Sequence, residues 1–312
     1  MFINFFTLNL GKSSISNKWK EFFELFFNDD RKIDENNMWV FCTQEDIPNS
    51  KFMLSLRIYI GNQFNIYEHS SYSCRNKFNI KMMIITHINN QITFENPYSI
   101  SIEDWITKAL RSCDSSSNRT NTRNTRILPE CIKRFVSYKA AIFIPIKYNG
   151  IPITFVGAHF PFNSKDEFDK VCIRKNTLIK IRNAIKTDIG FIMGDLNFRM
   201  ENAKDQLTTL LEKNINLNNA TNIENLSPTC KTLTTKEKEA IPLLKKLETK
   251  NNCDNEKYNC SRTPSHCDRV LYKNNNDDYT IIPIKSEVIT IKPIDESDHD
   301  GVYVKLKLEL KK

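Results

Sequence analysis

The chain has 312 residues, of which 40% are hydrophobic and 11% aromatic, and this composition argues against disorder over its whole length. The net charge of +8 favours anionic partners such as phosphorylated substrates, nucleic acid or an acidic membrane surface, but the basic residues are spread too widely to choose among them. Because large α/β folds often run past about 250 residues as one unit, we expect a single domain over residues 1–312.

Short apolar runs bounded by polar turns recur along the chain and predict strands. These runs lie at residues 1–8, 38–42, 53–60, 80–88, 141–146, 151–158, 189–193, 268–272, 279–284 and 301–310. Apolar residues at helical spacing predict helices at 17–27, 164–186 and 201–213. The polar tracts at 112–126 and 245–261 do not separate two complete cores, so we expect them to be loop insertions within the one domain.

The cysteines and the chain ends indicate where the protein works. The nine cysteines are odd in number, scattered and without a CxxC pair, which is typical of reduced intracellular thiols. Segment 1–6 is apolar but lacks a basic leader and a cleavage site, so we expect a strand there and no signal peptide. No apolar run approaches the ~18 residues of a membrane span, and no prenylation box ends the chain. We therefore expect a cytoplasmic protein whose membrane contact, if any, is peripheral and on the cytosolic face.

Three segments gather residues that suit phosphate chemistry. They read Met-Gly-Asp-Leu-Asn-Phe-Arg at 193–199, Pro-Ser-His-Cys-Asp-Arg-Val-Leu-Tyr at 264–272 and Ser-Asp-His at 297–299. Their Asp, Asn and His side chains stand beside β-rich apolar runs. Such groups can hold a hard cation, orient a water molecule and stabilise a pentavalent phosphorus, so the segments predict a metal-assisted phosphate-cleaving site.

In this order the segments resemble those of inositol polyphosphate 5-phosphatases, within the endonuclease/exonuclease/phosphatase superfamily. Weaker matches extend the resemblance over nearly the whole chain: Thr7-x-Asn9, Gln44-Glu45, Lys139, His159 and the segment 227–231. Gly-Asp-x-Asn alone also occurs in related nucleases and sphingomyelinases, but the ordered set is specific. The resemblance implies a DNase I-like fold, a four-layer α/β sandwich in which two mostly antiparallel sheets pack face to face with helices outside.

The resemblance also implies a Mg²⁺ cofactor. Glu45 resembles the principal magnesium carboxylate, with Asn9 close by, and Asp298 is expected near the metal, either as a ligand or beside it. Mg²⁺ prefers one or two carboxylates together with waters and substrate oxygens, so a sparse set of ligands is reasonable. A zinc site is not expected, because the spacing of the cysteines and histidine in segment 253–267 matches no common zinc motif.

The implied catalytic residues surround the phosphate. Asp195 resembles the residue that orients and deprotonates the attacking water, and Asn197 a donor to the scissile phosphate. If the strand continues through Leu196, Asp195 and Asn197 share one face. His299 is expected to touch the phosphate while Asp268 holds its far ring nitrogen and favours the charged imidazolium. His159 is expected to be a second phosphate donor.

The residues implied in substrate binding are Lys139, Lys231 and Arg262. Here the chain departs from the family, because Cys230 and Cys260 replace a Tyr and a Lys that hold the phosphate next to the one removed. A thiol is a weak donor without fixed charge, so we expect a weaker hold on that neighbouring phosphate. Asp300 replaces a basic residue, which we expect to lower affinity for highly phosphorylated substrates.

These inferences predict a Mg²⁺-dependent phosphatase that removes the 5-phosphate of phosphoinositides or soluble inositol polyphosphates by in-line attack of water. Two other functions stay open at this point: a nuclease or other phosphodiesterase of the same superfamily, and a catalytically weak phosphoinositide-binding module. The Pro-Thr-x-Lys and Arg-Thr-Pro-Ser segments argue against the first, so no nucleic-acid partner is expected. Retention of every implied chemical residue argues against the second.

Overall fold

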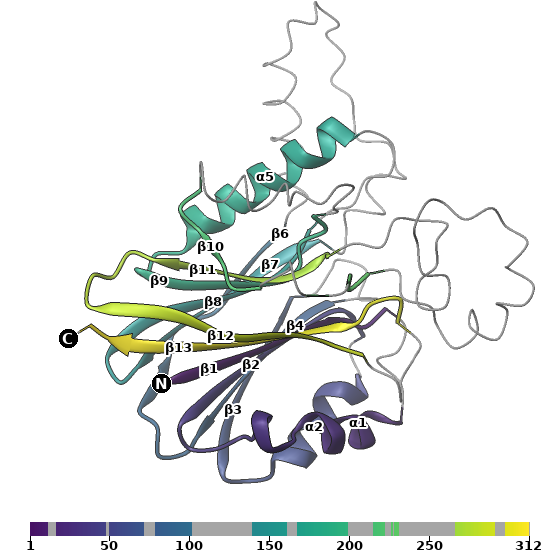
Figure 1. Cartoon of the computed structure of the whole chain (residues 1–312), viewed down its shortest axis with the longest axis vertical. Helices are drawn as coiled ribbons and strands as arrows, with labels where there is room; N and C mark the ends of the chain where they lie inside the picture. The colour runs from purple at the N-terminus through teal and green to yellow at the C-terminus, as the bar shows by residue number, and fades with distance from the viewer. Residues whose placement is uncertain are drawn as a thin grey trace, which may run out of the picture.

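Two β-sheets pack face to face and carry helices on their outer faces in the computed structural model (Figure 1). The residues that the structure describes are 1–11, 17–47, 50–71, 79–101, 139–160, 167–198, 215–221, 226, 228–230, 266–290 and 297–311. Their arrangement is the predicted four-layer α/β sandwich, so the predicted fold class is confirmed.

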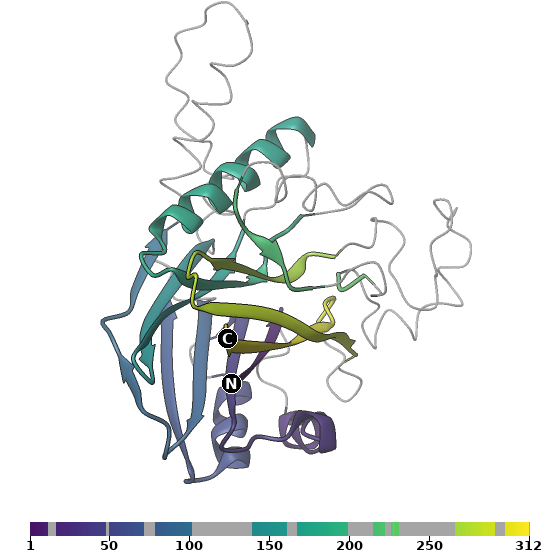
Figure 2. The same ribbon diagram turned by 60° about the vertical axis from the view of Figure 1, so that its left-hand side comes forward.

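The first sheet contains both ends of the chain. In spatial order its strands are β12 (Tyr279–Ile289), β13 (Gly301–Leu310), β1 (Phe2–Asn9), β2 (Asn37–Asp46), β4 (Asn79–His87) and β3 (Phe64–Ser71). Neighbouring strands are antiparallel except β1 and β2, which run parallel with Asn9 beside Gln44. The amino group of Met1 donates a hydrogen bond to the carbonyl of Leu308, so the two ends of the chain lie side by side (Figure 2).

The second sheet repeats this pattern. In spatial order its strands are β10 (Asn218–Asn219), β11 (Asp268–Asn274), β9 (Ile189–Asp195), β8 (Ile151–His159), β7 (Ala140–Tyr148) and β5 (Ile92–Phe94), and β6 (Tyr98–Ser101) also pairs with β7. Here β8 and β9 form the parallel pair, with His159 beside Asp195. Parallel neighbours end at the same edge of a sheet, so the last side chains of β8 and β9 meet there.

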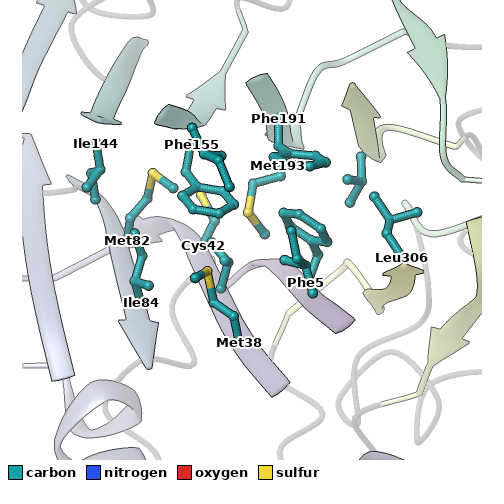
Figure 3. Packing of buried hydrophobic residues seen from close by; sticks show 14 of the residues in the cluster. Phe5, Met38, Cys42, Met82, Ile84, Ile144, Phe155, Phe191, Met193 and Leu306 are labelled. Carbon is teal, nitrogen blue, oxygen red and sulfur yellow. The ribbon is translucent and has the colours of Figure 1, made fainter. Parts of the chain in front are cut away.

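The space between the sheets is filled by alternate side chains from both (Figure 3). The ring of Phe5 on β1 lies 5.1 Å from that of Phe191 on β9 and 6.0 Å from that of Phe155 on β8, measured between centroids. The sulfur-containing side chains of Met82 and Met193 belong to the same buried cluster, with Met82 on the Ile144 side of Phe155. This core joins the two sheets and fixes their strand ends relative to each other.

The outer faces of the sheets bury separate apolar clusters. Helices α1 (Trp19–Phe26) and α2 (Lys51–Ile60) cover the first sheet with aromatic rings, among them Trp19 and Phe52 at a centroid distance of 4.7 Å. Helix α5 (Glu167–Ala184) covers the second sheet on the opposite side of the molecule. A short 3₁₀ helix at Asp29–Arg31 precedes β2. None of the helices in the described part of the chain is long and apolar enough to cross a membrane.

One predicted strand is wrong. Residues 53–60 belong to helix α2, because Ser50 caps its first turn by accepting from the amide of Phe52 and because Gly61 ends it at a φ of +74°. Strands β3, β5 and β6 were not predicted, since their faces are only partly buried and their sequences show weak contrast. The predicted helix at 201–213 and the predicted insertions at 112–126 and 245–261 lie outside the described residues.

Candidate active site

Polar side chains from the ends of several strands lie in contact with one another. Strand β1 runs toward them from the N-terminus, away from the end of the sandwich where both termini lie (Figure 1). Asn9 ends β1, and Glu45 is the next-to-last residue of the neighbouring β2. His159 ends β8 and Asp195 ends β9, while Asp268 begins β11 opposite Asp195. The alternation of the strands and the packing of the two sheets therefore bring together residues from five separate parts of the sequence.

Asp195 lies at the centre of this cluster and is 2% exposed. Its Oδ2 accepts a hydrogen bond from Asn9 Nδ2 at 3.2 Å and lies 3.4 Å from His159 Nε2. Its Oδ1 accepts from the backbone amide of Asn197 at 3.0 Å. Burial opposes ionisation of this carboxyl, but the hydrogen bond and charge of His159, with the charges of His299 and Lys139, outweigh burial and hold the pKa of Asp195 well below its usual range.

His159 connects Asp195 to Glu45. It is 1% exposed, and its Nε2 contacts Lys139 Nζ and lies 3.9 Å from Glu45 Oε1. Burial lowers the pKa of His159, and the nearby charge of Lys139 lowers it further. Lys139 and His159, which are predicted to bind the substrate phosphate, therefore lie together beside Asp195, and the charges of Asp195 and Glu45 partly oppose the lowering of the imidazole pKa.

A second pair lies across the site. His299 Nδ1 is 2.9 Å from Asp268 Oδ2, and the same oxygen accepts from Thr229 Oγ1 at 2.8 Å. Burial raises the pKa of Asp268 to about 6. Burial alone would lower the pKa of His299, but Cys230 and the Asp268 carboxylate raise it well above its usual value. The predicted contact between Asp268 and the far ring nitrogen of His299 is present, and it favours the charged imidazolium.

Backbone contacts hold His299 at this position. Cys230, which is buried, pairs with His299 in an isolated β-bridge, and the amide of Asp300 donates to the carbonyl of Thr229 at 2.7 Å. Ser297 Oγ donates to the carbonyl of Asn9 at 2.6 Å and accepts from the amide of His299 at 3.2 Å. These links tie the segment before β13 to the ends of other strands.

Asn197 differs from its predicted arrangement. Strand β9 ends at Asp195, and Asn197 adopts a left-handed φ of +52°, so Asp195 and Asn197 do not share one face of an extended strand. Its side-chain amide donates to the carbonyl of Phe160 at 2.9 Å, which leaves the second amide hydrogen for a substrate. Short polar Asn tolerates this conformation better than most residues, and the sequence offers no direct signal for it.

Glu45 and Asp298 present carboxylates at the more open side of the cluster. Glu45 has a left-handed φ of +52°, and its side chain is 38% exposed. The Asp298 side chain is 41% exposed, with Oδ1 3.9 Å from His299 Nε2. In the part of the chain that the structure describes, no three His, Cys, Asp or Glu side chains are grouped so that they could hold a metal ion by themselves. Oxygen donors from Glu45, Asn9 and Asp298 suit a hard cation that also takes waters and substrate oxygens.

Some predicted site residues lie outside the described part of the chain, and the structure in turn contains two residues near the site that were not predicted. The predicted substrate-binding residues Lys231 and Arg262, together with Cys260, fall outside the described residues. The structure adds a buried ion pair between Lys81 and Asp46, the residue that follows Glu45 in the chain. Lys81 is the single charge in the apolar run at 80–85, and this was the signal that could have found the pair.

A two-sheet sandwich with these Asn, Glu, His and Asp residues at its strand ends defines a protein of the endonuclease/exonuclease/phosphatase superfamily. The model of endonuclease/exonuclease/phosphatase family 2 matches residues 6–305, and the chain belongs to this family. No curated protein sequence matches the chain. Members of the superfamily are largely phosphoesterases and nucleases, which agrees with a hydrolase.

Solved structures support the same fold. The inositol polyphosphate 5-phosphatase domain of SPsynaptojanin, in complex with inositol (1,4)-bisphosphate and calcium ion, is 14% identical with a TM-score of 0.56 and covers 99% of this chain and 85% of its own. TDP2 of D. rerio with a single-strand DNA product is 12% identical with a TM-score of 0.55, covering 98% and 99% of the two chains. A Cimex nitrophorin mutant in its ferrous NO complex is 12% identical with a TM-score of 0.57, covering 99% of each chain. Since these proteins have different ligands, the fold does not by itself define the substrate.

Proposed function

We propose that the protein is a Mg²⁺-dependent phosphatase that hydrolyses the 5-phosphate of phosphoinositides or soluble inositol polyphosphates. The observation that carries this proposal is the buried, ionised Asp195, which is held by Asn9 and His159 beside the carboxylate of Glu45. A fixed acceptor next to an open carboxylate is what activation of water beside a hard cation requires.

Glu45 and Asn9 would hold the Mg²⁺ ion, with Asp298 as a ligand or close by. When bound, the ion neutralises charge on the phosphoryl oxygens. The ion prefers few protein ligands, and the oxygen donors of Glu45, Asn9 and Asp298, with both carboxylates partly exposed, match this preference. The calcium ion in the synaptojanin domain complex supports a divalent cation in this fold.

Asp195 orients the attacking water and accepts its proton. The water oxygen forms a bond to phosphorus as the ester P–O bond opposite to it breaks. The inositol oxygen leaves with the bonding electron pair and takes up a proton from solvent, so no covalent enzyme intermediate is formed. Because its pKa is low, Asp195 is ionised at neutral pH and can accept a hydrogen bond that orients the water. Asn9 fixes the direction of its carboxylate, so the water is held in line with the leaving oxygen.

The positive groups around Asp195 stabilise the charge that moves over the phosphate. His299, which Asp268 keeps charged, donates to one phosphoryl oxygen. Lys139, which contacts His159, donates to another phosphoryl oxygen. His159 contacts both Lys139 and Asp195 and so fixes the positions of these two side chains relative to each other. These donors are buried or half-buried, and charge stabilisation is stronger there than in bulk water.

Recognition of the inositol ring is assigned to Lys139, Lys231 and Arg262. With Cys230 and Cys260 in place of two donors, a phosphate next to the scissile one contributes less than it would beside Tyr and Lys. The substrate is a lipid headgroup reached peripherally at an acidic cytosolic membrane surface, or the free inositol phosphate in the cytoplasm. The net charge of +8 supports either anion.

A second candidate function is phosphodiester hydrolysis, and the structural likeness to TDP2 with its single-strand DNA product favours it. Such an enzyme would use the same Glu45, Asp195, Asn197 and His299. The two functions differ in the ester cleaved, so they can be separated by substrate.

The test is phosphate release from a panel of soluble and lipid inositol phosphates, with Mg²⁺ and with excess chelator. We expect release from 5-phosphorylated members only, and none with chelator or in the Glu45→Gln variant. Single-stranded DNA serves as a diester substrate in parallel. Cleavage of this DNA with no release from inositol phosphates would refute the proposal in favour of the second function.

A further inference from the structure

We propose that the buried ion pair between Asp46 and Lys81 orients the carboxylate of Glu45 toward the bound cation. The inference rests on the proposed Mg²⁺ site and adds two residues to which the reaction assigns no role. Glu45 must leave the first sheet and turn its carboxylate toward His159 and Asp195, although its neighbours on both sides in β2 are buried. Contacts within the first sheet must therefore stabilise the turn at Glu45.

The turn at Glu45 is a β-bulge. Thr43 lies opposite Lys81 and Asp46 opposite Asn79 in the pairing of β2 with β4, so the two residues at 44–45 face a single residue of β4. The extra residue is accommodated by the left-handed φ of +52° at Glu45. A Glu residue does not favour this conformation, so contacts outside the local backbone must hold it.

Side chains on the two sides of the bulge supply those contacts. Asp46 Oδ2 accepts a hydrogen bond from Thr43 Oγ1 at 2.9 Å and lies 3.6 Å from Lys81 Nζ. The same ammonium donates to the carbonyl of Ile47 at 2.9 Å. Thr43 and Asp46 are fully buried, and the Lys81 side chain is 6% exposed. Together these bonds close the chain around residues 44–45 and fix where Glu45 emerges.

The burial of this pair is itself informative. Removing two opposite charges from water is costly, and a well-packed apolar pair of similar volume is often as stable. An apolar pair could not, however, bond to the Thr43 hydroxyl and the Ile47 carbonyl on the two sides of the bulge. The geometry therefore points to orientation of Glu45 as the role of Lys81 and Asp46, in the same way that residues behind a metal ligand orient it.

The experiment measures binding of Mn²⁺, which shares the preference of Mg²⁺ for oxygen ligands, to the full chain by electron paramagnetic resonance. We expect Asp46→Asn and Lys81→Met each to weaken Mn²⁺ binding about tenfold or more. The matched control is Lys147→Met, because Lys147 also lies 3.6 Å from a carboxylate, that of Glu95, but at an exposed site far along β7. This control should bind Mn²⁺ as the wild type does.

Activity gives a second measurement on the same variants. The Mg²⁺ concentration for half-maximal rate should rise by the same factor as the Mn²⁺ dissociation constant, while kcat at saturating Mg²⁺ stays near the wild-type value. A purely structural defect would lower kcat without this shift. If Lys81→Met and Asp46→Asn do not fold, Thr43→Val removes only one hydroxyl of the same arrangement and should weaken Mn²⁺ binding in the same direction.

Two negative results are distinguishable. Wild-type Mn²⁺ binding that Glu45→Gln abolishes but the Asp46, Lys81 and Thr43 variants leave unchanged would overturn the positioning role and leave the proposed function intact. Wild-type protein without any binding that depends on Glu45 would overturn the Mg²⁺ assignment, and the positioning role with it.

Discussion

Asp195 is ionised although it is almost completely buried, and its neighbours explain why. Three donors surround its two oxygens: the Asn9 amide, the His159 ring and the backbone amide of Asn197. A carboxylate with this many hydrogen bonds is stabilised in its charged form in spite of burial. The same contacts restrict its orientation, so its role depends on side chains that the sequence places far apart.

We expect Asp195→Ala to lower the rate of phosphate release by at least about 10²-fold, because the acceptor for the water proton is lost. Asp195→Asn keeps the shape and should be similarly impaired, while its urea unfolding midpoint shows whether the protein still folds. A rate near that of the wild type in both variants would mean that another group is the base.

The pair of Asp268 and His299 makes activity depend on pH. Since burial raises the pKa of Asp268 to about 6, acidification through this value protonates the carboxyl and removes the negative partner of His299. We expect kcat/KM to fall as the pH drops through about 6. Asp268→Asn should lower the rate at neutral pH and remove this acidic limb. A wild-type profile that stays level down to about pH 5 would contradict the assignment.

Protonation of Asp268 has opposite effects on activity and on stability, because it lowers the rate but stabilises the folded protein. The folded protein binds the Asp268 proton more tightly than the unfolded chain does, because its pKa lies above the unfolded value of about 3.9. This contribution to the free energy of unfolding is complete below about pH 4 and is lost as the pH rises through about 6. Comparing wild type with Asp268→Asn by urea unfolding over this range isolates it.

At the scale of secondary-structure elements, two glycines adopt a positive φ but differ in how closely other atoms approach them. Gly194, just before Asp195 in β9, has a φ of +136°, and a Cβ there would stand 1.9 Å from the carbonyl oxygen of Ala158 on β8. Gly61 at the end of α2 has a φ of +74°, but a Cβ there would meet nothing within 4 Å. The parallel pairing of β8 and β9 at the site therefore depends on Gly194.

We expect Gly194→Ala to destabilise the protein by more than about 2 kcal/mol, since either β9 must move away from β8 or the backbone must be strained. Gly61→Ala is the matched control and should cost only about 1 kcal/mol, the penalty of the left-handed conformation alone. Urea unfolding of both variants gives the comparison. Equal costs for the two substitutions would show that the close approach at Ala158 is relieved easily.

At the scale of the whole molecule, the core between the sheets sets the geometry of the site. Phe5 belongs to the strand that ends in Asn9, and Phe191 to the strand that ends in Asp195. Their rings are in contact, and both side chains are essentially buried. The hydrogen bond between Asn9 and Asp195 crosses from one sheet to the other, so it requires this packing.

We expect Phe5→Ala and Phe191→Ala each to cost about 3–5 kcal/mol of unfolding free energy. Because the two rings touch, the double variant should cost less than the sum of the single ones. Leu25→Ala on α1, where the side chain is 64% exposed, should change stability by less than about 0.5 kcal/mol. Additive costs for Phe5 and Phe191, measured by denaturant unfolding, would show that the sheets are not coupled through this contact.

The sequence by itself determined most of the strands, because apolar runs are a local signal, while the fold class and the candidate site residues came from the resemblance of its motifs to a known family. Short apolar runs bounded by polar turns, such as those ending at Asn9 and Asp195, form strands buried on both faces, and the order of short motifs indicated the family. Helix α2 was missed because its apolar run at 53–60 is short enough to fit either element, and only its cap residues distinguish them.

Only the tertiary structure decided how these residues meet. The left-handed turn of Asn197, the bulge at Glu45 and the buried pair of Asp46 with Lys81 all depend on contacts between segments that are distant in the chain. Local sequence preferences do not encode such contacts, since a left-handed Glu or a buried Lys is unfavourable alone and is stabilised only by the partners that folding brings to it.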